Sequence, residues 1–228
     1  MIVQARSTQH NPSAMQKSSR KAGAFTLIEL LVVIAIIAIL IGLLFPAFSA
    51  VQNQAKRTQA KNDLTQIVTA VNAYYTEYGK YPVPSGTTAD YIYGPGATST
   101  NDVLFNELRA TATATQNPRK IVFINPPDVK DPLNPRSGIA TQAGTVNGVS
   151  IPIGSFVDPW GMPYAIEIDG NYDNQILVNP YALNAGATSL QIGVIAWSFG
   201  KDAQSQSVPG PAADKKTGTN DDDVISWQ

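Results

Sequence analysis

The sequence predicts an α+β protein in which one long N-terminal helix packs, along its second half, on a small antiparallel β-sheet. Three observations lead to this fold class. An apolar stretch of 21 residues occupies positions 25–45. Apolar residues then recur at spacings of three and four as far as Tyr78, which is the period of an amphipathic helix. Short β-prone runs bounded by Pro- and Gly-rich segments follow, as in a small sheet joined by loops.

Residues 25–45 are long enough to form a membrane-spanning helix, because about 20 apolar residues in a helix cross the hydrocarbon core of a bilayer. One carboxylate, Glu29, lies near the start of this stretch. A charged side chain at mid-membrane costs about 2.5–3.5 kcal/mol on insertion scales, so Glu29 needs a positive partner. Cleavage of the chain directly before Phe25 would create an α-amino group one helical turn away, able to form a charge-assisted hydrogen bond with Glu29.

Residues 1–24 are polar, carry four basic residues and no acidic one, and are expected to be a leader that is removed. Their positive charge favours a cytoplasmic N-terminus. Removal leaves 12 of the 16 basic residues against 17 acidic ones, and this mildly acidic composition gives no support for nucleic-acid binding. The alternative is an ordinary secretory signal cleaved at residues 47–49. Such a signal has a shorter apolar core of about 7–15 residues, and an acidic residue near its start is unexpected.

Residues 23–30, with the sequence GAFTLIEL, closely resemble the processing site of type IV pilins and type II secretion pseudopilins, as do the long apolar stretch and Pro46 behind them. The resemblance implies that a membrane-embedded prepilin peptidase cuts between Ala24 and Phe25 and methylates the new amine. It also implies that Glu29 pairs with the amine of a neighbouring subunit, so that Phe25 and Glu29 serve filament assembly. Ala24 stands where the family usually has Gly.

Residues 46–79 are expected to continue the helix as its amphipathic half. The apolar residues at helical spacing are Leu64, Ile67, Val68, Val71, Tyr74, Tyr75 and Tyr78. Gly79 follows directly and is a natural residue with which to end a helix. The predicted helix covers 54 residues, or about 80 Å at 1.5 Å per residue. A globular α+β domain at residues 80–228 follows.

The globular domain is expected to contain one short helix and three or four strands. The helix begins at Thr100 or Asn101, either of which can cap it, and ends near Arg109. The β-prone runs that predict strands are residues 164–168, 175–178 and 190–198.

The motif DPWGMPY occupies residues 158–164. Asp-Pro followed by Gly marks a tight turn. The motif resembles the signature of the major pseudopilin of type II secretion, which narrows the resemblance within the family. Trp160 is expected to anchor the core, and no catalytic role is assigned to it.

An acidic cluster near the C-terminus consists of Asp221, Asp222 and Asp223, with Asp202 upstream. Adjacent carboxylates repel one another unless they are solvated or bridged by a cation, and calcium accepts six to eight oxygen ligands. The segment resembles the C-terminus of pseudopilins, in which calcium stabilises the domain. The resemblance implies a structural calcium with Asp202, Asp222 and Asp223 as side-chain ligands and Asp221 as a further candidate.

Two features depart from the family pattern of this segment. Ala203 replaces the usual Gly, and 18 residues separate Asp202 from Asp221, more than in the family loop. The alternative interpretation is a solvated acidic tail, which is usual for an isolated run of like charges.

The composition argues against an enzyme. The chain has no cysteine, and its one histidine, His10, lies in the expected leader. The mature chain would therefore lack the common histidine base, the cysteine nucleophile and histidine ligands for zinc.

The resemblance implies a structural subunit of a type II secretion pseudopilus, a homo-oligomeric helical filament that drives protein export across the outer membrane. Such a subunit is anchored in the bacterial inner membrane with its globular domain in the periplasm, and works with a secretion platform and minor pseudopilins. One alternative is a type IV pilin of a surface filament for adhesion, motility or DNA uptake. Another is a membrane-anchored binding module that never assembles, for which Glu29 would be dispensable.

Overall fold

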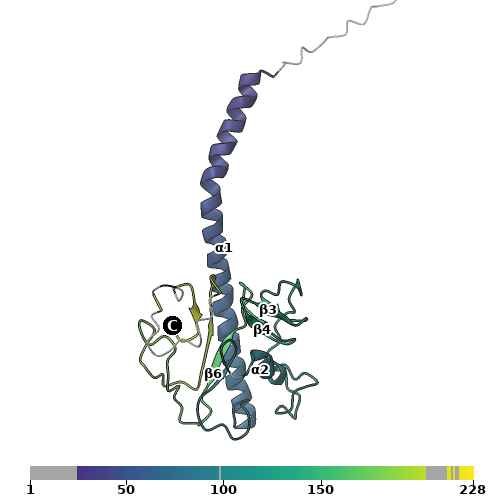
Figure 1. The fold of residues 1–228 in the computed structure, drawn as a ribbon, viewed down its shortest axis with the longest axis vertical. Coiled ribbons are helices and arrows are strands. Elements are labelled where there is room, and N and C mark those ends of the chain that lie inside the picture. Colours follow the sequence, from purple (N-terminus) through teal and green to yellow (C-terminus); the bar gives the residue numbers. More distant parts are fainter. Residues whose placement is uncertain (1–24, 98, 204–214, 217, 219–220) are drawn as a thin grey trace, which may run out of the picture. The chain divides into compact units, whose positions relative to one another are not determined.

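A computed structural model describes residues 25–97, 99–203, 215–216, 218 and 221–228. The chain divides into two compact units, Met1–Ala47 and Phe48–Gln228. Helix α1, Leu27–Tyr78, begins in the first unit and ends in the second (Figure 1). A long N-terminal helix followed by small antiparallel sheets confirms the predicted α+β fold class.

In the first unit, α1 presents apolar side chains on all sides. Every described residue from 25 to 45 is exposed, including Leu27 at 82 % and Phe45 at 71 %. The helix is long and apolar enough to cross a membrane, with a mean hydropathy of 3.2 in its most apolar window. Such a surface suits lipid chains or the apolar faces of other helices.

In the second unit, α1 buries one face in the protein core. Residues spaced by three or four along this face, such as Leu64, Ile67 and Val71, are fully covered. The helix ends as predicted at Gly79, which has a positive φ of 66° and donates its N–H to the Tyr75 carbonyl oxygen at 2.8 Å. Glycine tolerates this left-handed conformation without a Cβ clash, which explains why the helix stops there.

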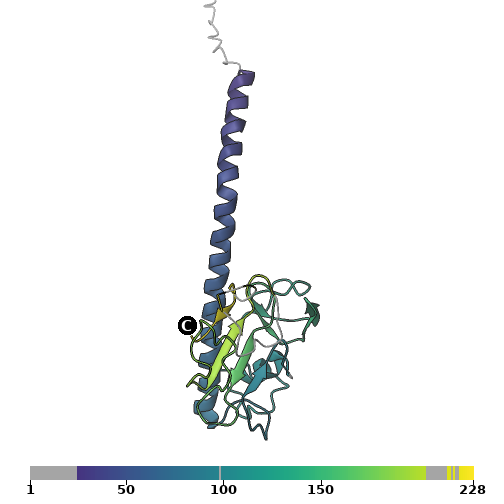
Figure 2. The same cartoon turned by 60° about the vertical axis from the view of Figure 1, so that its left-hand side comes forward.

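The main sheet has four antiparallel strands in the order β1-β6-β7-β8. Their bounds are β1 Tyr91–Tyr93, β6 Ala165–Ile168, β7 Val194–Ser198 and β8 Val224–Ile225. Figure 2 shows these strands beside the second half of α1. Ile166 and Ile168 join the core cluster that contains the buried face of α1, whereas Ala165 joins a second cluster with Ile195 and Trp197. The alternation of side chains along each strand thus builds a core on both faces of the sheet.

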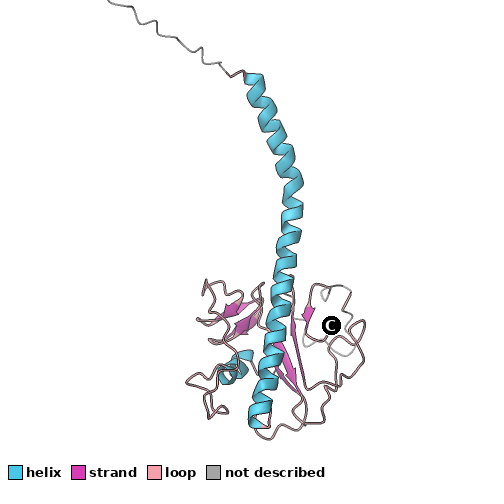
Figure 3. Ribbon diagram, turned by 180° about the vertical axis from the view of Figure 1, so that it is seen from behind, coloured by secondary structure: helices cyan, strands magenta, loops and turns pink. Residues whose placement is uncertain are grey.

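The smaller elements lie around this sheet. Their bounds are α2 Asn101–Leu108, β2 Gly138–Ile139, β3 Gly144–Val146, β4 Val149–Ile151 and β5 Phe156–Val157. Strand β2 pairs with β5, and β3 pairs with β4, both antiparallel. Seen from behind, α2 and the β3–β4 hairpin lie on one side of α1 and the C-terminal segment lies on the other (Figure 3).

The strand predictions are only partly confirmed. Residues 175–178 do not form a strand, and Ile176 makes only an isolated bridge with Leu190. The strand predicted at 190–198 begins at Val194, and the one predicted at 164–168 begins at Ala165. The short helix, by contrast, begins at Asn101 as predicted and ends one residue before Arg109.

The DPWG turn is organised by one buried carboxylate. Asp158 Oδ1 accepts hydrogen bonds from the backbone N–H groups of Trp160, Gly161 and Met162 at 2.8–3.0 Å. Its Oδ2 accepts the Ser198 hydroxyl of β7 at 2.6 Å. Complete burial raises the pKa of Asp158 to about 6, although these hydrogen bonds favour its charged form. Trp160 lies in the core cluster, as predicted.

Candidate assembly segment and acidic C-terminal segment

The first turn of α1 is closed by a reciprocal contact between Thr26 and Glu29. The Thr26 backbone N–H donates to Glu29 Oε2 at 2.8 Å, and the Thr26 hydroxyl donates to the same oxygen at 2.7 Å. The Glu29 N–H donates in return to Thr26 Oγ1 at 3.3 Å. This arrangement is a capping box, which satisfies N–H groups that the start of a helix otherwise leaves without partners. The role predicted for Glu29 did not include this contact, although a Thr-x-x-Glu spacing is its usual signal.

The capping box leaves Glu29 able to accept a further donor. A carboxylate offers about four acceptor positions, and Thr26 uses two of them. Phe25, the residue predicted to carry the new amine, lies directly before the box and is exposed. Ala24, on the other side of the predicted cut, lies outside the described residues. Glu29 therefore has capacity to bind an ammonium group while it keeps the helix end closed.

The aspartates of the predicted calcium site lie on two segments of the second unit. Asp202 follows β7, and the acidic cluster leads into β8. The Asp202 N–H donates to Asp222 Oδ2 at 2.8 Å. The Tyr181 hydroxyl donates to Asp223 Oδ2 at 2.6 Å. One carboxylate oxygen of Asp222 and one of Asp223 thus already have a donor from the protein itself.

Asp223 is the buried member of the cluster. Its side chain is only 4 % exposed, and Oδ1 is buried without a hydrogen-bond partner. Burial raises the pKa of Asp223 to about 7, while the Tyr181 hydrogen bond and the Lys215 ammonium group act in the opposite direction. A cation could bind to this oxygen of Asp223, because it has no hydrogen-bond donor of its own.

The backbone around Asp222 is tightly packed. Gly200 has a φ of 65°, and a Cβ at this position would lie 2.5 Å from the Asp222 carbonyl oxygen. Only glycine fits such a close approach. Ala203, at the position where the pseudopilin pattern usually has Gly, also has a positive φ, of 50°. The structure therefore gives a conformational reason for glycine at position 203, and alanine is held there with some backbone strain.

The four predicted ligands are not gathered into one group. In the described ranges of the chain, no three His, Cys, Asp or Glu side chains lie close enough together to hold a metal ion. The hydrogen bond from Asp202 to Asp222 comes from the Asp202 backbone N–H. Against this, Asp223 Oδ1 is an oxygen still lacking a partner. Calcium therefore stays a prediction.

Two basic side chains of α1 reach the C-terminal segment, a contact that the sequence did not predict. Arg57 Nη2 donates to the Asp221 carbonyl oxygen at 2.8 Å, and Lys61 Nζ donates to the Ile225 carbonyl oxygen at 2.7 Å. A spacing of four places Arg57 and Lys61 on one face of α1, which is visible in the sequence. Their partners lie 164 residues further along the chain, and a separation of this size leaves no local signal.

Comparisons with known proteins identify the N-terminal segment. Residues 19–45 match the family described as "Prokaryotic N-terminal methylation motif". The Type IV major pilin protein PilA of Myxococcus xanthus is 40 % identical over 57 residues, which cover 25 % of this chain and 26 % of that protein. The Type II secretion system core protein G of Pseudomonas aeruginosa is 40 % identical over 63 residues, which cover 28 % of this chain and 44 % of that protein.

These matches confirm the predicted resemblance to type IV pilins and type II secretion pseudopilins. The matched segments span about a quarter of one curated relative and less than half of the other. One relative is named as a pilin and the other as a secretion-system protein, so the two do not separate these classes. No solved structure matches the chain.

Proposed function

From the N-terminal methylation motif of type IV pilins and pseudopilins that this chain carries, we propose that it is a membrane-anchored structural subunit of a helical filament. The single observation that carries the proposal is this motif, which spans residues 19–45 and includes the first part of α1, where apolar side chains are exposed on every side. A membrane-spanning stage followed by packing against sister helices gives these side chains an apolar environment before and after assembly.

The proposal assigns roles to three residues at the start of the mature chain. A prepilin peptidase cuts between Ala24 and Phe25 and methylates the Phe25 amine. Glu29 then pairs with the amine of a neighbouring copy, for which the capping box leaves acceptor positions available. In an apolar surrounding this pair is worth more than in water, so it favours one register between neighbouring helices.

The finer proposal is a type II secretion pseudopilus. The DPWG turn, fixed by Asp158, and the acidic C-terminal segment are the features that favour it over a surface pilus. In this role the chain sits in the inner membrane with its globular domain in the periplasm. Its partners are further copies of itself, minor pseudopilins and the inner-membrane secretion platform. The proposed role is structural and not enzymatic.

Intact-mass measurement tests processing. The membrane-extracted protein from cells that contain the peptidase should begin at Phe25 with one added methyl group, whereas cells that lack the peptidase should retain residues 1–24. Retention of the leader in both strains would sink the filament proposal. Cleavage after residue 49 instead would identify an ordinary secretory signal.

Deletion of the gene separates the two filament classes. A pseudopilus subunit is required for the release of exported proteins into the medium, whereas a surface pilin is required for filaments on intact cells. Loss of surface filaments with normal protein release would favour the pilin. A chain that is processed, but stays monomeric and keeps its cellular role with Glu29→Gln, would be a non-assembling membrane-anchored module.

A further inference from the structure

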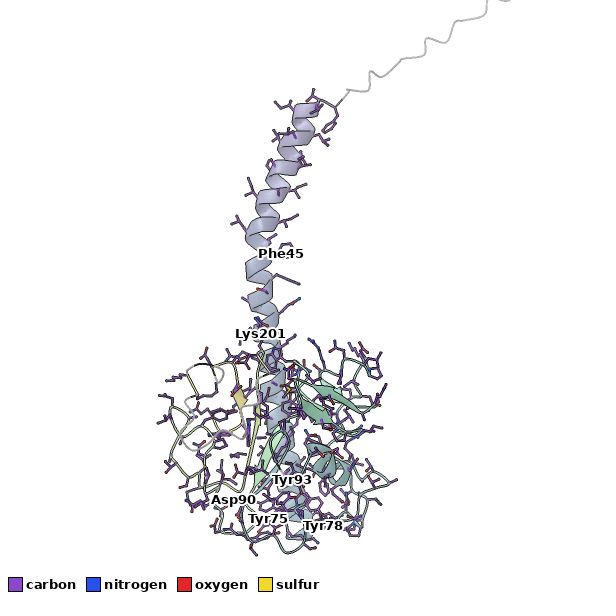
Figure 4. The ribbon with its side chains drawn as sticks, viewed as in Figure 1. Phe45, Tyr75, Tyr78, Asp90, Tyr93 and Lys201 are labelled. Atoms are coloured by element: carbon purple, nitrogen blue, oxygen red, sulfur yellow. The ribbon has the colours of Figure 1, made fainter. Side chains whose placement is uncertain are left out.

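The acidic C-terminal segment is held against α1 by positively charged side chains. Besides Arg57 and Lys61, Lys215 reaches the segment, with its Nζ 3.4 Å from the Asp221 carbonyl oxygen. Lys61 also contacts the backbone oxygen of Gln228. The three basic side chains line one shallow pocket of about 610 Å³, and Asp223 lines the same pocket. Figure 4 shows the side chains of α1 and of the elements around its second half, with Lys201, the residue before Asp202, labelled.

Several oxygens that a divalent cation would use already accept hydrogen bonds from the protein, whereas Asp223 Oδ1 does not. The Asp221 carbonyl oxygen accepts from Arg57 and Lys215, and one oxygen of Asp222 accepts the Asp202 N–H. Calcium requires six to eight oxygen ligands, so it would have to displace several of these donors. A cation at Asp223 would also lie beside a pocket that this residue lines together with three positive side chains, and like charges disfavour this.

The third positive group, Lys215, comes from a part of the sequence that differs from the pseudopilin pattern. Lys215 lies in the long connection between Asp202 and Asp221, the part of the acidic segment that departs most from the pseudopilin pattern. Its backbone N–H donates to the Leu183 carbonyl oxygen at 3.1 Å, which anchors it beside the acidic residues. The longer connection therefore supplies a positive charge of its own.

We propose that Arg57 and Lys61, with Lys215 as a third positive group, fix the acidic C-terminal segment on α1 in place of a divalent cation. Each contributes a charge-assisted hydrogen bond to a backbone carbonyl, and together they offset the negative charge of the neighbouring aspartates. The proposal is independent of filament assembly, because all the contacts lie within one copy of the second unit.

Thermal unfolding of the full chain in detergent micelles tests the proposal. Tm of the wild type should be the same in excess EGTA and in millimolar calcium chloride. Lys61→Met should lower Tm by about 4 °C or more in both solutions, since the charge-assisted hydrogen bonds to the backbone oxygens of Ile225 and Gln228 are lost. Arg57→Gln should do the same to a smaller extent, because Arg57 is exposed. The matched control is Lys56→Met, on the same helix, which removes the same charge and should leave Tm within about 1 °C of the wild type.

A fall in the wild-type Tm on chelation would overturn the proposal and establish calcium instead. Terbium luminescence gives an independent readout, because Tyr181 and Trp227 lie next to the acidic segment and can sensitise a bound terbium ion. Saturable terbium luminescence that micromolar calcium abolishes would likewise refute the proposal that Arg57, Lys61 and Lys215 take the place of a cation. Absence of such a signal, with a lowered Tm for Lys61→Met and an unchanged Tm for Lys56→Met, would support it.

Discussion

Replacement of Glu167 by glutamine tests whether this buried carboxyl group of the main sheet makes the stability of the fold depend on pH. Glu167 lies on β6 opposite Ile92 of β1 and is only 3 % exposed. Its Oε2 has no hydrogen-bond partner, and neither does the buried Oδ1 of Asp90, which lies two residues before Ile92 in the chain. Burial, and then the negative charge of Asp90, raise the pKa of Glu167 from 4.5 to about 8.

The size of the effect follows from this shift. Unfolded, Glu167 loses its proton near pH 4.5, whereas the folded chain keeps it until about pH 8. The folded state therefore binds one more proton between these values, and the free energy of unfolding falls by about 1.4 kcal/mol for each pH unit in that window. The stability that protonated Glu167 contributes is fully present below pH 4.5 and is lost above pH 8. Relative to pH 4.5, the titration of Glu167 lowers the free energy of unfolding by about 3 kcal/mol at pH 7 and by about 5 kcal/mol above pH 8.

Glutamine has nearly the same shape as glutamic acid and carries no charge. Glu167→Gln should therefore unfold at higher denaturant concentration than the wild type at pH 8, and at a similar concentration at pH 5. Denaturant unfolding of the full chain in micelles, followed by Trp fluorescence, measures this difference. Asp131→Asn, at an exposed position, is the control and should not change the pH dependence. If wild type and Glu167→Gln keep the same difference at pH 5 and pH 8, Glu167 is not the titrating group.

Three further predictions concern the two units of the chain. Glu29→Ala should be processed normally but fail to form filaments, as measured by sedimentation of sheared cells; filaments of normal amount would contradict the pairing role. Asp158→Ala should lower the free energy of unfolding by about 3 kcal/mol, because three N–H groups and the Ser198 hydroxyl lose their acceptor; a loss under about 1 kcal/mol in thermal unfolding would show that the turn holds without it. A chain that starts at Phe48 should fold as a soluble monomer, since the buried face of α1 begins at Ala60; lost near-ultraviolet circular dichroism, or aggregation on gel filtration, would show that the removed part is needed.

The parts of the fold that could be predicted are those whose cause is local. The length of α1, its amphipathic period and its end at Gly79 follow from residues that are neighbours on one helix. The DPWG turn is local in the same way, because Asp158 bonds the three N–H groups that follow it within four residues. In both cases the residue pattern and the interaction lie in the same short window.

The parts that could not be predicted depend on partners far along the chain. Strands β1 and β8 have three and two residues, too few to show an alternating pattern, and they exist because β6 and β7 offer their edges. Residues 175–178 are β-prone but form no strand, because propensity is a weak guide where no partner strand is in register. The contacts of Arg57 and Lys61 with the C-terminal segment belong to the same class.

The apolar side chains of the two halves of α1 require different explanations, because only those of the second half are buried within a single copy. The second half buries its apolar face in its own domain, so its sequence is accounted for by folding. The first half exposes large apolar side chains all round, and contact of such a surface with water is unfavourable. In lipid these side chains gain little from contact with another helix, because hydrocarbon tails are as apolar as leucine. In the proposed filament, apolar side chains therefore form the contact surface between neighbouring helices, and pairing of Glu29 with an amine fixes the register of these helices. Neither is sufficient for assembly without the other.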